Sequence, residues 1–286
     1  MSYEIETLKS AITIPEPDPY FFLPVKVINM LKWINELSKR HPVNVLVIGR
    51  QGCGKSSLVR QFAARNRRPL ATFQVGMLSE PGQLFGELRL KGGETYYKKF
   101  LFPEAIQTPN CVIHLEEINR PENPKALNML LSILSEDRQA WIDELGLVKV
   151  AKGVVFFATM NEGEEFVGTE MLDAALRDRF YTITLDYPPP EVEAKILHLK
   201  TGIDEAEALT IVNVANRLRN HPKEPIPISI RHTIMIAELV SVGASIPDAF
   251  MFSLSLSKDT LESVLLSLHV EEGMTGKITS EEYAQY

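Results

Sequence analysis

The stretch Gly49-Arg-Gln-Gly-Cys-Gly-Lys-Ser-Ser-Leu-Val59 follows the apolar run Val43–Ile48 and decides the fold. It fits the pattern G-x-x-x-x-G-K-[ST] from Gly49 to Ser56, with a predicted buried strand before it and a predicted helix after it. The plain alternative is a glycine-rich turn that happens to carry a lysine. The correct flanks on both sides favour a phosphate-binding loop instead.

Glycines in such a loop let backbone N–H groups converge on phosphate oxygens at a helix N-terminus, where the helix dipole favours an anion. In this pattern Lys55 is expected to reach the β- and γ-phosphates of a nucleotide, and the Ser56 hydroxyl is expected to bind Mg²⁺. The predicted nucleotide-binding residues of the loop are Gly49, Arg50, Gln51, Gly52, Cys53, Gly54, Lys55, Ser56 and Ser57.

The composition is that of a globular protein with a core. The chain has 286 residues, of which 45% are hydrophobic and 23% charged. This length predicts a main domain and a smaller second one. The formal net charge of -7 argues against broad, sequence-independent DNA binding, which needs a basic face. A local basic patch stays possible, so nucleic acid stays open as a partner.

The cysteines and the N-terminal segment indicate a cytoplasmic protein. Cys53 and Cys111 are the two cysteines, and neither has metal-ligand spacing, so we expect small, reduced side chains. The N-terminal segment lacks the basic start and apolar core of a signal peptide, and no apolar run approaches the roughly 18 residues of a membrane helix. We therefore expect no membrane insertion.

Short apolar runs alternate with helical patterns along the first two thirds of the chain. This alternation predicts an α/β fold, with a parallel sheet covered by helices on both faces. The expected strands are Val43–Ile48, Leu70–Val75, Cys111–Leu115, Val154–Met160 and Phe180–Leu185, and the expected helices are Pro24–Ser38, Lys55–Arg65, Pro124–Ser135 and Glu170–Arg177.

The strand pattern stops at Asp186-Tyr-Pro-Pro-Pro190, where the prolines stiffen the chain and predict a hinge. Beyond it, helices are expected over Glu191–Lys200, Asp204–Arg219, Ser229–Val242 and Lys258–His269. The predicted organisation is an N-terminal tail and leading helix (1–40), an α/β nucleotide-binding domain (41–188) and a helical lid domain (189–286).

Two carboxylates end the strand within Cys111–Arg120. Ligands bind at the carboxyl ends of strands in open α/β sheets, so Glu116 and Glu117 are expected beside the phosphate-binding loop. Glu116 would hold Mg²⁺ through water, and Glu117 would orient or deprotonate the attacking water. Solvated acids at a strand end are the alternative for this motif taken alone.

Two further patterns complete the predicted site. Asn161 ends the strand Phe156-Phe-Ala-Thr-Met-Asn161, as if held between the γ-phosphate and the nucleophilic water. Arg177 and Arg179 follow in Leu172-Asp-Ala-Ala-Leu-Arg-Asp-Arg-Phe180. An arginine there could point into the nucleotide of a neighbouring subunit and stabilise transition-state charge. A surface arginine pair balancing nearby aspartates is the alternative.

Together these motifs resemble the AAA+ ATPases, more narrowly the branch with the MoxR, NorQ/CbbQ and gas-vesicle N-type proteins; McrB, midasin and dynein are more distant. GRQGCGKSS, EEINR with the proline after it, ATMN and LDAALRDRF carry the resemblance, which covers about residues 43–240. It implies ATP and Mg²⁺ as cofactors and a five-stranded sheet of order 5-1-4-3-2. It also implies that Arg231, in Ile228-Ser-Ile-Arg231, contacts the nucleotide from the lid.

The resemblance extends to two inserts and has one clear departure. Residues 81–97 resemble the family's loop after the second strand, which faces a pore or a partner and here carries Tyr96 and Tyr97. Residues 141–148 are expected to form a β-hairpin in the place of the second insert. Glu116 stands where the family usually has aspartate, which could slow hydrolysis because Mg²⁺ demands near-ideal octahedral geometry.

The resemblance implies a homo-oligomeric ring, with a hexamer expected, that hydrolyses ATP at subunit interfaces to remodel a protein client. A nucleotide-gated assembly scaffold with slow hydrolysis is an alternative, and so is a McrB-like NTPase motor working with a nuclease, which predicts GTP preference. MoxR-type ATPases commonly act with a von Willebrand factor A domain protein, so such a partner is expected. No base-reading residue in the sequence decides between ATP and GTP.

Overall fold

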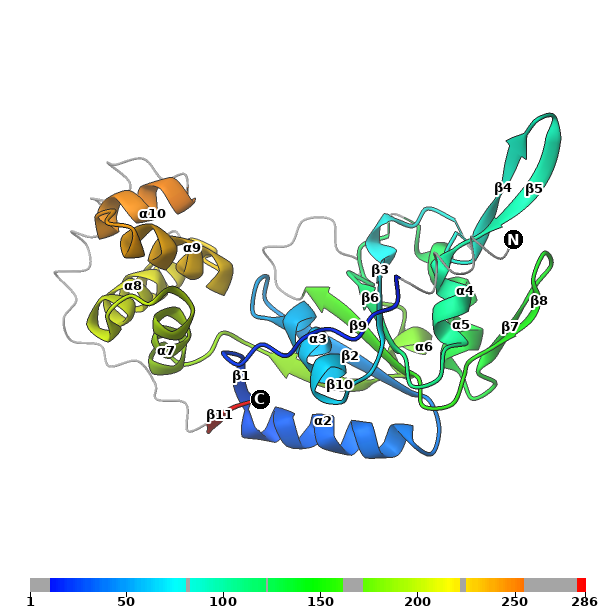
Figure 1. Ribbon diagram of the computed structural model, residues 1–286, viewed down its shortest axis with the longest axis horizontal. Coiled ribbons are helices and arrows are strands. Elements are labelled where there is room, and N and C mark those ends of the chain that lie inside the picture. The colour runs from blue at the N-terminus through cyan, green and yellow to red at the C-terminus, as the bar shows by residue number, and fades with distance from the viewer. Residues whose placement is uncertain (1–10, 81–82, 122, 162–171, 222–224, 255–281) are drawn as a thin grey trace. The chain divides into compact units, whose positions relative to one another are not determined.

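The computed structural model of the chain describes residues 11–80, 83–121, 123–161, 172–221, 225–254 and 282–286 (Figure 1). The helix expected over Lys258–His269 lies outside these residues, as does the start of the one expected over Glu170–Arg177. The chain forms two compact units. The α/β unit holds the described residues of Met1–Pro17, Asn29–Arg50 and Lys55–Leu185, and the helical unit holds those of Asp18–Ile28, Gln51–Gly54 and Asp186–Tyr286.

A five-stranded parallel sheet forms the centre of the α/β unit. Its strand order is β10-β2-β9-β6-β3, which confirms the order 5-1-4-3-2. All five strands lie within one residue of their expected ends: β2 (Val43–Gly49), β3 (Leu70–Gln74), β6 (Val112–Glu116), β9 (Val155–Asn161) and β10 (Tyr181–Leu185). Every residue of β2 is buried, as expected for a central strand covered on both faces.

Helices cover both faces of this sheet. On one face Phe62, from α3 (Lys55–Arg65), packs against Phe157 of β9 with ring centroids 5.0 Å apart. Successive side chains of a strand point to opposite faces, so Phe156 packs on the other side, in the core that α4 (Leu101–Ile106) and α5 (Asn128–Leu134) share. The helix predicted over Pro124–Ser135 divides into the 3₁₀ turn η2 (Pro124–Leu127) and α5; the 3₁₀ turn η1 (Val75–Met77) follows β3, and α6 (Ala174–Arg177) precedes β10.

Two antiparallel hairpins extend from the α/β unit (Figure 1). β4 (Gly86–Lys91) pairs with β5 (Glu94–Lys99), and β7 (Gln139–Ile142) pairs with β8 (Gly146–Lys149), which confirms the hairpin expected over residues 141–148. In the first hairpin Leu88 is 63% exposed and Leu90 is 74% exposed. Tyr96 is also exposed, but Tyr97 is half-buried against Gly86 across the hairpin. The two aromatic side chains therefore do not form one exposed pair.

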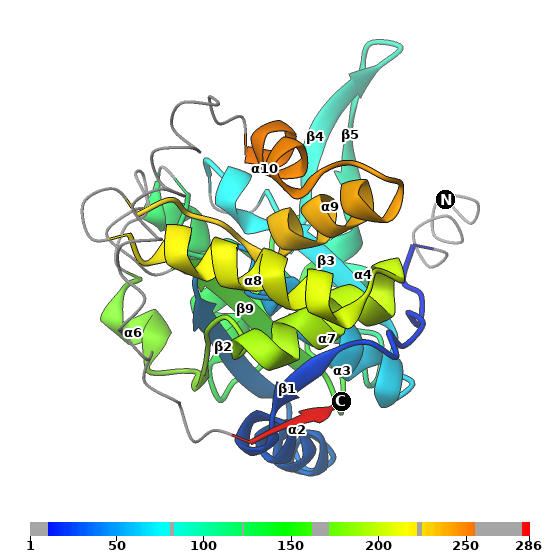
Figure 2. The same cartoon turned by 90° about the vertical axis from the view of Figure 1, so that its left-hand side faces the viewer.

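In the described residues of the helical unit, α7, α8, α9 and α10 pack together (Figure 2). Their bounds are α7 (Pro190–Thr201), α8 (Glu205–Arg219), α9 (Ile230–Ser241) and α10 (Ile246–Leu254), and their apolar faces share one core. The short strand β1 (Phe22–Pro24) leads into α2 (Val25–Ser38) and pairs with β11 (Tyr283–Gln285). The sequence pattern predicts α7, α8, α9 and α2, but not α10 or the pairing of β1 with β11. Within the described part of the chain, no helix has both the length and the apolar character to cross a membrane.

A buried ion pair fixes α7 against α8. Arg219 Nη1 lies 2.7 Å from Glu193 Oε2, Nη2 lies 2.8 Å from Oε1, and the side chains are 3% and 0% exposed. Replacing Glu193 with alanine would leave the Arg219 charge buried without its carboxylate, which typically costs roughly 3–5 kcal/mol. We therefore expect Glu193→Ala to lower the free energy of unfolding by that amount in chemical denaturation. Glu191→Ala, at an exposed position of the same helix, is the control; similar curves for both variants would contradict the expectation.

Candidate nucleotide-binding site

Lys55 and Asn161 meet at the carboxyl edge of the sheet. The Lys55 ammonium group donates to Asn161 Oδ1 at 2.8 Å and to the carbonyls of Gly49 and Arg50 at 2.9 and 2.7 Å. Gly49 and Asn161 are register partners at the ends of neighbouring strands, and Lys55 is the first residue of α3. The strand pairing thus brings the lysine of the loop to the amide group of Asn161, which is expected beside the γ-phosphate.

The loop between β2 and α3 has the backbone that a phosphate-binding loop needs. Gly52 and Gly54 have φ angles of 69° and 98°, in the left-handed region that glycine adopts without a steric cost. Ser56 and Ser57 are exposed in the first turn of α3, so the Ser56 hydroxyl is open to a ligand. Of the other predicted loop residues, Arg50 and Gln51 are exposed and Cys53 is buried.

Glu116 ends β6 and lies among polar side chains that no sequence motif marks. Gln74, its register partner at the end of β3, donates from Nε2 to its carboxylate. His114 Nδ1 lies 3.8 Å from Glu116 Oε1, and the other ring nitrogen lies 3.4 Å from Thr159 Oγ1. Burial lowers the pKa of His114 to about 4, against the opposing effect of Glu116, so the ring is neutral near pH 7. Residues two apart on a strand share a face, so the sequence could have indicated that His114 lies on the same side of β6 as Glu116.

Glu117 lies in a tight turn directly after β6. Its φ angle is 55°, which is rare for a residue with a side chain, and its carboxylate lies 2.8 Å from Arg120 Nη1. The turn is packed so closely that a Cβ on Gly76 would lie 3.2 Å from Glu117 Cβ. Such strained positions persist only where the surrounding structure enforces them, and they cluster at functional sites.

The turn that carries Glu117 is also bonded to β9. The Ile118 amide donates to the Thr159 carbonyl at 3.0 Å, and Asn119 Nδ2 donates to the Asn161 carbonyl at 3.1 Å. These bonds hold the turn beside the strand that ends in Asn161. The structure therefore brings the two acids, Asn161 and Lys55 to the same edge of one sheet.

Arg177 and Arg179 lie at the opposite edge. Arg179 precedes the start of β10, where Tyr181 pairs with Val45, whereas the other end of β10, Leu185, pairs with Gly49 at the loop. The four steps of strand between those ends span about 13 Å at ~3.3 Å per residue. These arginines are therefore separated from the loop of their own chain by the length of the strand.

The surroundings of the two arginines differ. The Arg179 carbonyl accepts from Asn44 Nδ2 at 2.9 Å, its Nη1 donates to the Ala175 carbonyl, and its buried Nε has no hydrogen-bond partner among the described residues. Arg177, in the last turn of α6, is exposed. Asp173 caps this short helix by accepting from the Ala175 amide at 2.8 Å. The cap and the Asn44 bond fix the backbone on both sides of the arginines.

Arg231 lies exposed in the first turn of α9, in the helical unit. Ser229, two residues earlier, caps this helix in a capping box with His232 and lies against Gly52 of the loop. The start of the helix that carries Arg231 is therefore next to the loop segment. The spacing of Ser229 and His232 only weakly indicates a capping box in the sequence, because the residue in the histidine's position is usually Glu or Gln.

The loop, the two acids, Asn161 and the parallel sheet define a P-loop nucleotide-binding domain. Comparison with known proteins specifies the family. The family model described as "AAA domain (dynein-related subfamily)" matches residues 44–180, and the one described as "CbbQ/NirQ/NorQ C-terminal" matches residues 193–264. The chain belongs to the AAA+ ATPases of the MoxR and CbbQ/NorQ type.

Relatives cover most of the chain. The protein named "Putative chaperone BssE" of Thauera aromatica is 61% identical over 96% of this chain and 96% of its own length. NorQ of Paracoccus denitrificans is 28% identical over 75% of this chain and 79% of its own. A solved structure of a RuvB point mutant from Thermotoga maritima has a TM-score of 0.54 and 21% identity, and covers 91% of this chain and 76% of that one. At that identity the likeness shows the AAA+ fold alone.

The two cysteines differ in their expected reactivity. Cys111 is 0% exposed and burial raises its pKa to about 12, against a weaker lowering effect of the Ala71 backbone, whereas Cys53 lies in the loop and is 7% exposed. The thiolate is the reactive form, and full burial and a raised pKa both suppress it at Cys111, so we expect a maleimide to modify Cys53 faster than Cys111 in the folded protein. Mass spectrometry of the modified protein measures this.

Modification of Cys53 should stop nucleotide turnover, because the added group would occupy the loop. An ATP analogue should slow the modification, and Cys111→Ala should keep the sensitivity of the parent protein. Turnover unchanged in protein that is fully modified at Cys53 would contradict the prediction.

Proposed function

We propose that this protein is a ring-forming ATPase that uses ATP binding and hydrolysis at subunit interfaces to remodel a protein client. The observation that carries the proposal is the position of Arg179. It lies a strand length away from the loop of its own chain, with its backbone fixed by Asn44. An arginine this far from its own phosphate-binding loop can act on the nucleotide of a neighbouring subunit, where its guanidinium group would bind phosphate.

The residues at the carboxyl edge fit a magnesium nucleotide. The left-handed glycines Gly52 and Gly54 leave the loop backbone open to phosphate oxygens, and Lys55 supplies the positive charge. The exposed Ser56 hydroxyl and the partly exposed carboxylate of Glu116 are oxygen ligands of the kind that Mg²⁺ prefers, with Glu116 acting through water. Bound magnesium would neutralise phosphate charge during phosphoryl transfer.

The protein side chains have separate roles in this proposal. Glu117 orients the attacking water and accepts its proton, and Asn161 holds the γ-phosphate and that water in line. Arg179, with Arg177 beside it, stabilises charge in the site of the adjacent subunit. Arg231 contacts the nucleotide from the helical unit. Nucleotide choice follows the family, so ATP is preferred over GTP.

The exposed hairpins support a protein client. Leu88 and Leu90 on the first hairpin and Trp141 on the second are large apolar side chains left in solvent. Apolar side chains that gather on an exposed projection indicate a protein contact. The relative from Thauera aromatica carries a name that describes a chaperone. We extend this activity to the present chain, in the cytoplasm and with a von Willebrand factor A domain protein as the expected partner.

Electron microscopy of the protein with a non-hydrolysable ATP analogue and with ADP tests the assembly. We expect closed rings, with six subunits in each, in the presence of the ATP analogue at micromolar concentration. Turnover per subunit should then rise with protein concentration as rings form, because each site needs an arginine from a neighbour. A monomer under both conditions that has full turnover would contradict the proposal.

A further inference from the structure

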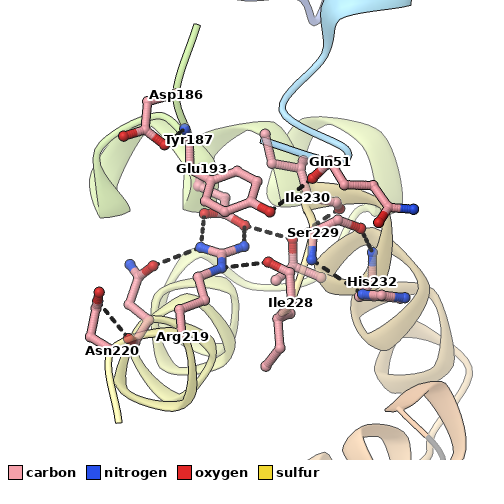
Figure 3. A network of polar contacts seen from close by, with 12 residues as sticks. Gln51, Asp186, Tyr187, Glu193, Arg219, Asn220, Ile228, Ser229, Ile230 and His232 are labelled. Atoms are coloured by element: carbon pink, nitrogen blue, oxygen red, sulfur yellow. Dashed lines mark hydrogen bonds and ion pairs between the residues drawn. The ribbon is translucent and has the colours of Figure 1, made fainter. Parts of the chain in front are cut away.

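Two segments of the helical unit contact neighbouring residues of the phosphate-binding loop, and Figure 3 shows the first of these contacts, at Gln51. The Tyr187 hydroxyl donates to the Gln51 carbonyl at 2.8 Å. At the next residue, a Cβ built on Gly52 would lie 2.3 Å from Ser229 Cβ and 2.9 Å from its Oγ, so Ser229 lies directly against this glycine. Tyr187 follows β10, and Ser229 caps α9, so two separate segments contact two adjacent residues of the loop.

Arg219 supports both contacts. Its guanidinium carbon lies 4.4 Å from the centroid of the Tyr187 ring, which is close enough for a cation–π interaction. Its Nε donates at 2.7 Å to the carbonyl of Ile228, the residue before Ser229. One side chain on α8 therefore orients both the tyrosine ring and the start of α9.

Arg219 is itself fixed by buried partners. Both of its terminal nitrogens bind the Glu193 carboxylate, and Nη1 also donates to Asn216 Oδ1 at 2.6 Å. Glu193 Oε1 accepts a further hydrogen bond, at 2.7 Å, from the hydroxyl of Thr233 on α9. In a buried and fully bonded network of this kind, removing one member leaves the others unsatisfied, so the network has one preferred geometry.

We propose that Tyr187 is a positioning residue for nucleotide binding, which rests on the proposed function of the loop. A peptide group is planar and trans, so fixing the Gln51 carbonyl also fixes the Gly52 N–H, which points in the opposite direction. Backbone N–H groups of this loop are the expected phosphate donors. The Tyr187 hydroxyl thus orients a phosphate donor before the nucleotide arrives, and Arg219 keeps the ring in place.

Tyr187→Phe tests this role, because it removes the hydroxyl and leaves the ring that Arg219 contacts. A neutral hydrogen bond of this kind corresponds to roughly a three- to tenfold change in an equilibrium constant. We expect the KM for ATP and the dissociation constant of a non-hydrolysable analogue to rise by that factor. The kcat at saturating ATP should stay within about twofold, since ground state and transition state lose the same contact. Tyr181→Phe, at an exposed position on β10, should bind like the parent protein.

The outcomes separate this role from a structural one and from the proposed function. A Tyr187→Phe variant with the parent KM and analogue affinity overturns the role of Tyr187, provided that the parent protein binds ATP. A fall in kcat with unchanged KM also overturns it, because the effect would not lie in nucleotide binding. A parent protein that binds no nucleotide overturns the proposed function itself. Thermal unfolding of both variants, with midpoints expected close to that of the parent, shows that the fold is retained.

Discussion

Replacing Glu117 with glutamine should reduce ATP turnover by about 10²–10⁴-fold, the range typical of losing a general base. Glutamine keeps the shape of the side chain and can fill the tight turn after β6, but it cannot accept a proton from water. Nucleotide binding should remain, because Lys55 and the loop are unchanged. Phosphate release under steady-state conditions measures turnover, and titration with a fluorescent ATP analogue measures binding.

The matched control for Glu117→Gln is Glu87→Gln. It makes the same chemical change on the first hairpin, at a residue that has no role in the proposed site. Turnover of Glu117→Gln at the parent rate would contradict the role of Glu117 as the base. The variant also separates a motor from a scaffold. A motor should form rings and lose client remodelling, whereas a scaffold should keep its function with trapped ATP.

The five sheet strands could be predicted closely because burial on both faces leaves a strong pattern in the sequence. β2 is fully buried and carries one polar side chain, Asn44, whose amide bonds to the carbonyls of Leu134 and Arg179. An apolar run with one polar interruption still favours a buried strand when turn residues bound it. The order of the strands came from the family resemblance, since pairing between distant segments is not visible in one sequence.

The elements that the sequence did not predict are short or depend on distant partners. β1 and β11 have three residues each, and β1 contains Pro24. The two strands pair although they are separated by almost the whole length of the chain. α10 (Ile246–Leu254) has nine residues, most of them apolar, with Pro247 in its first turn, and periodicity alone does not distinguish a helix from a strand in so short an apolar run. Their formation is decided by tertiary contacts and not by local pattern.

The main site residues were predictable because the carboxyl ends of parallel strands lie at one edge. That rule alone places Glu116 and Asn161 near the loop before Lys55. The supporting contacts were not predictable. Tyr187 and Gln51 are 136 residues apart, and a tyrosine before three prolines has no sequence signal for binding a carbonyl. Only the fold shows that the two residues meet.

The position of Arg179 leads to a prediction with a still larger expected effect. Replacing it with alanine should lower turnover by about 10³–10⁵-fold, the range found for arginines that stabilise transferring phosphate from a neighbouring protein. Arg177→Ala should have a smaller effect. Arg177 is exposed, whereas the Arg179 backbone is fixed by Asn44, so Arg179 is the better preorganised of the two. Steady-state phosphate release at ring-forming concentrations measures both variants.

Mixing experiments decide whether Arg179 acts on a neighbouring subunit. Lys55→Ala subunits should be inactive at their own loop but still present Arg179, whereas Arg179→Ala subunits keep an intact loop. If each site lies between two subunits in a head-to-tail ring, random mixing in equal amounts should restore about a quarter of the parent turnover, because a quarter of the interfaces pair an intact loop with an intact arginine. A mixture as inactive as its two components would contradict action in trans. Glu117→Gln mixed with Lys55→Ala is the control. Glu117 and Lys55 belong to the same site of one chain, so no site in this mixture has both residues intact and turnover should not be restored.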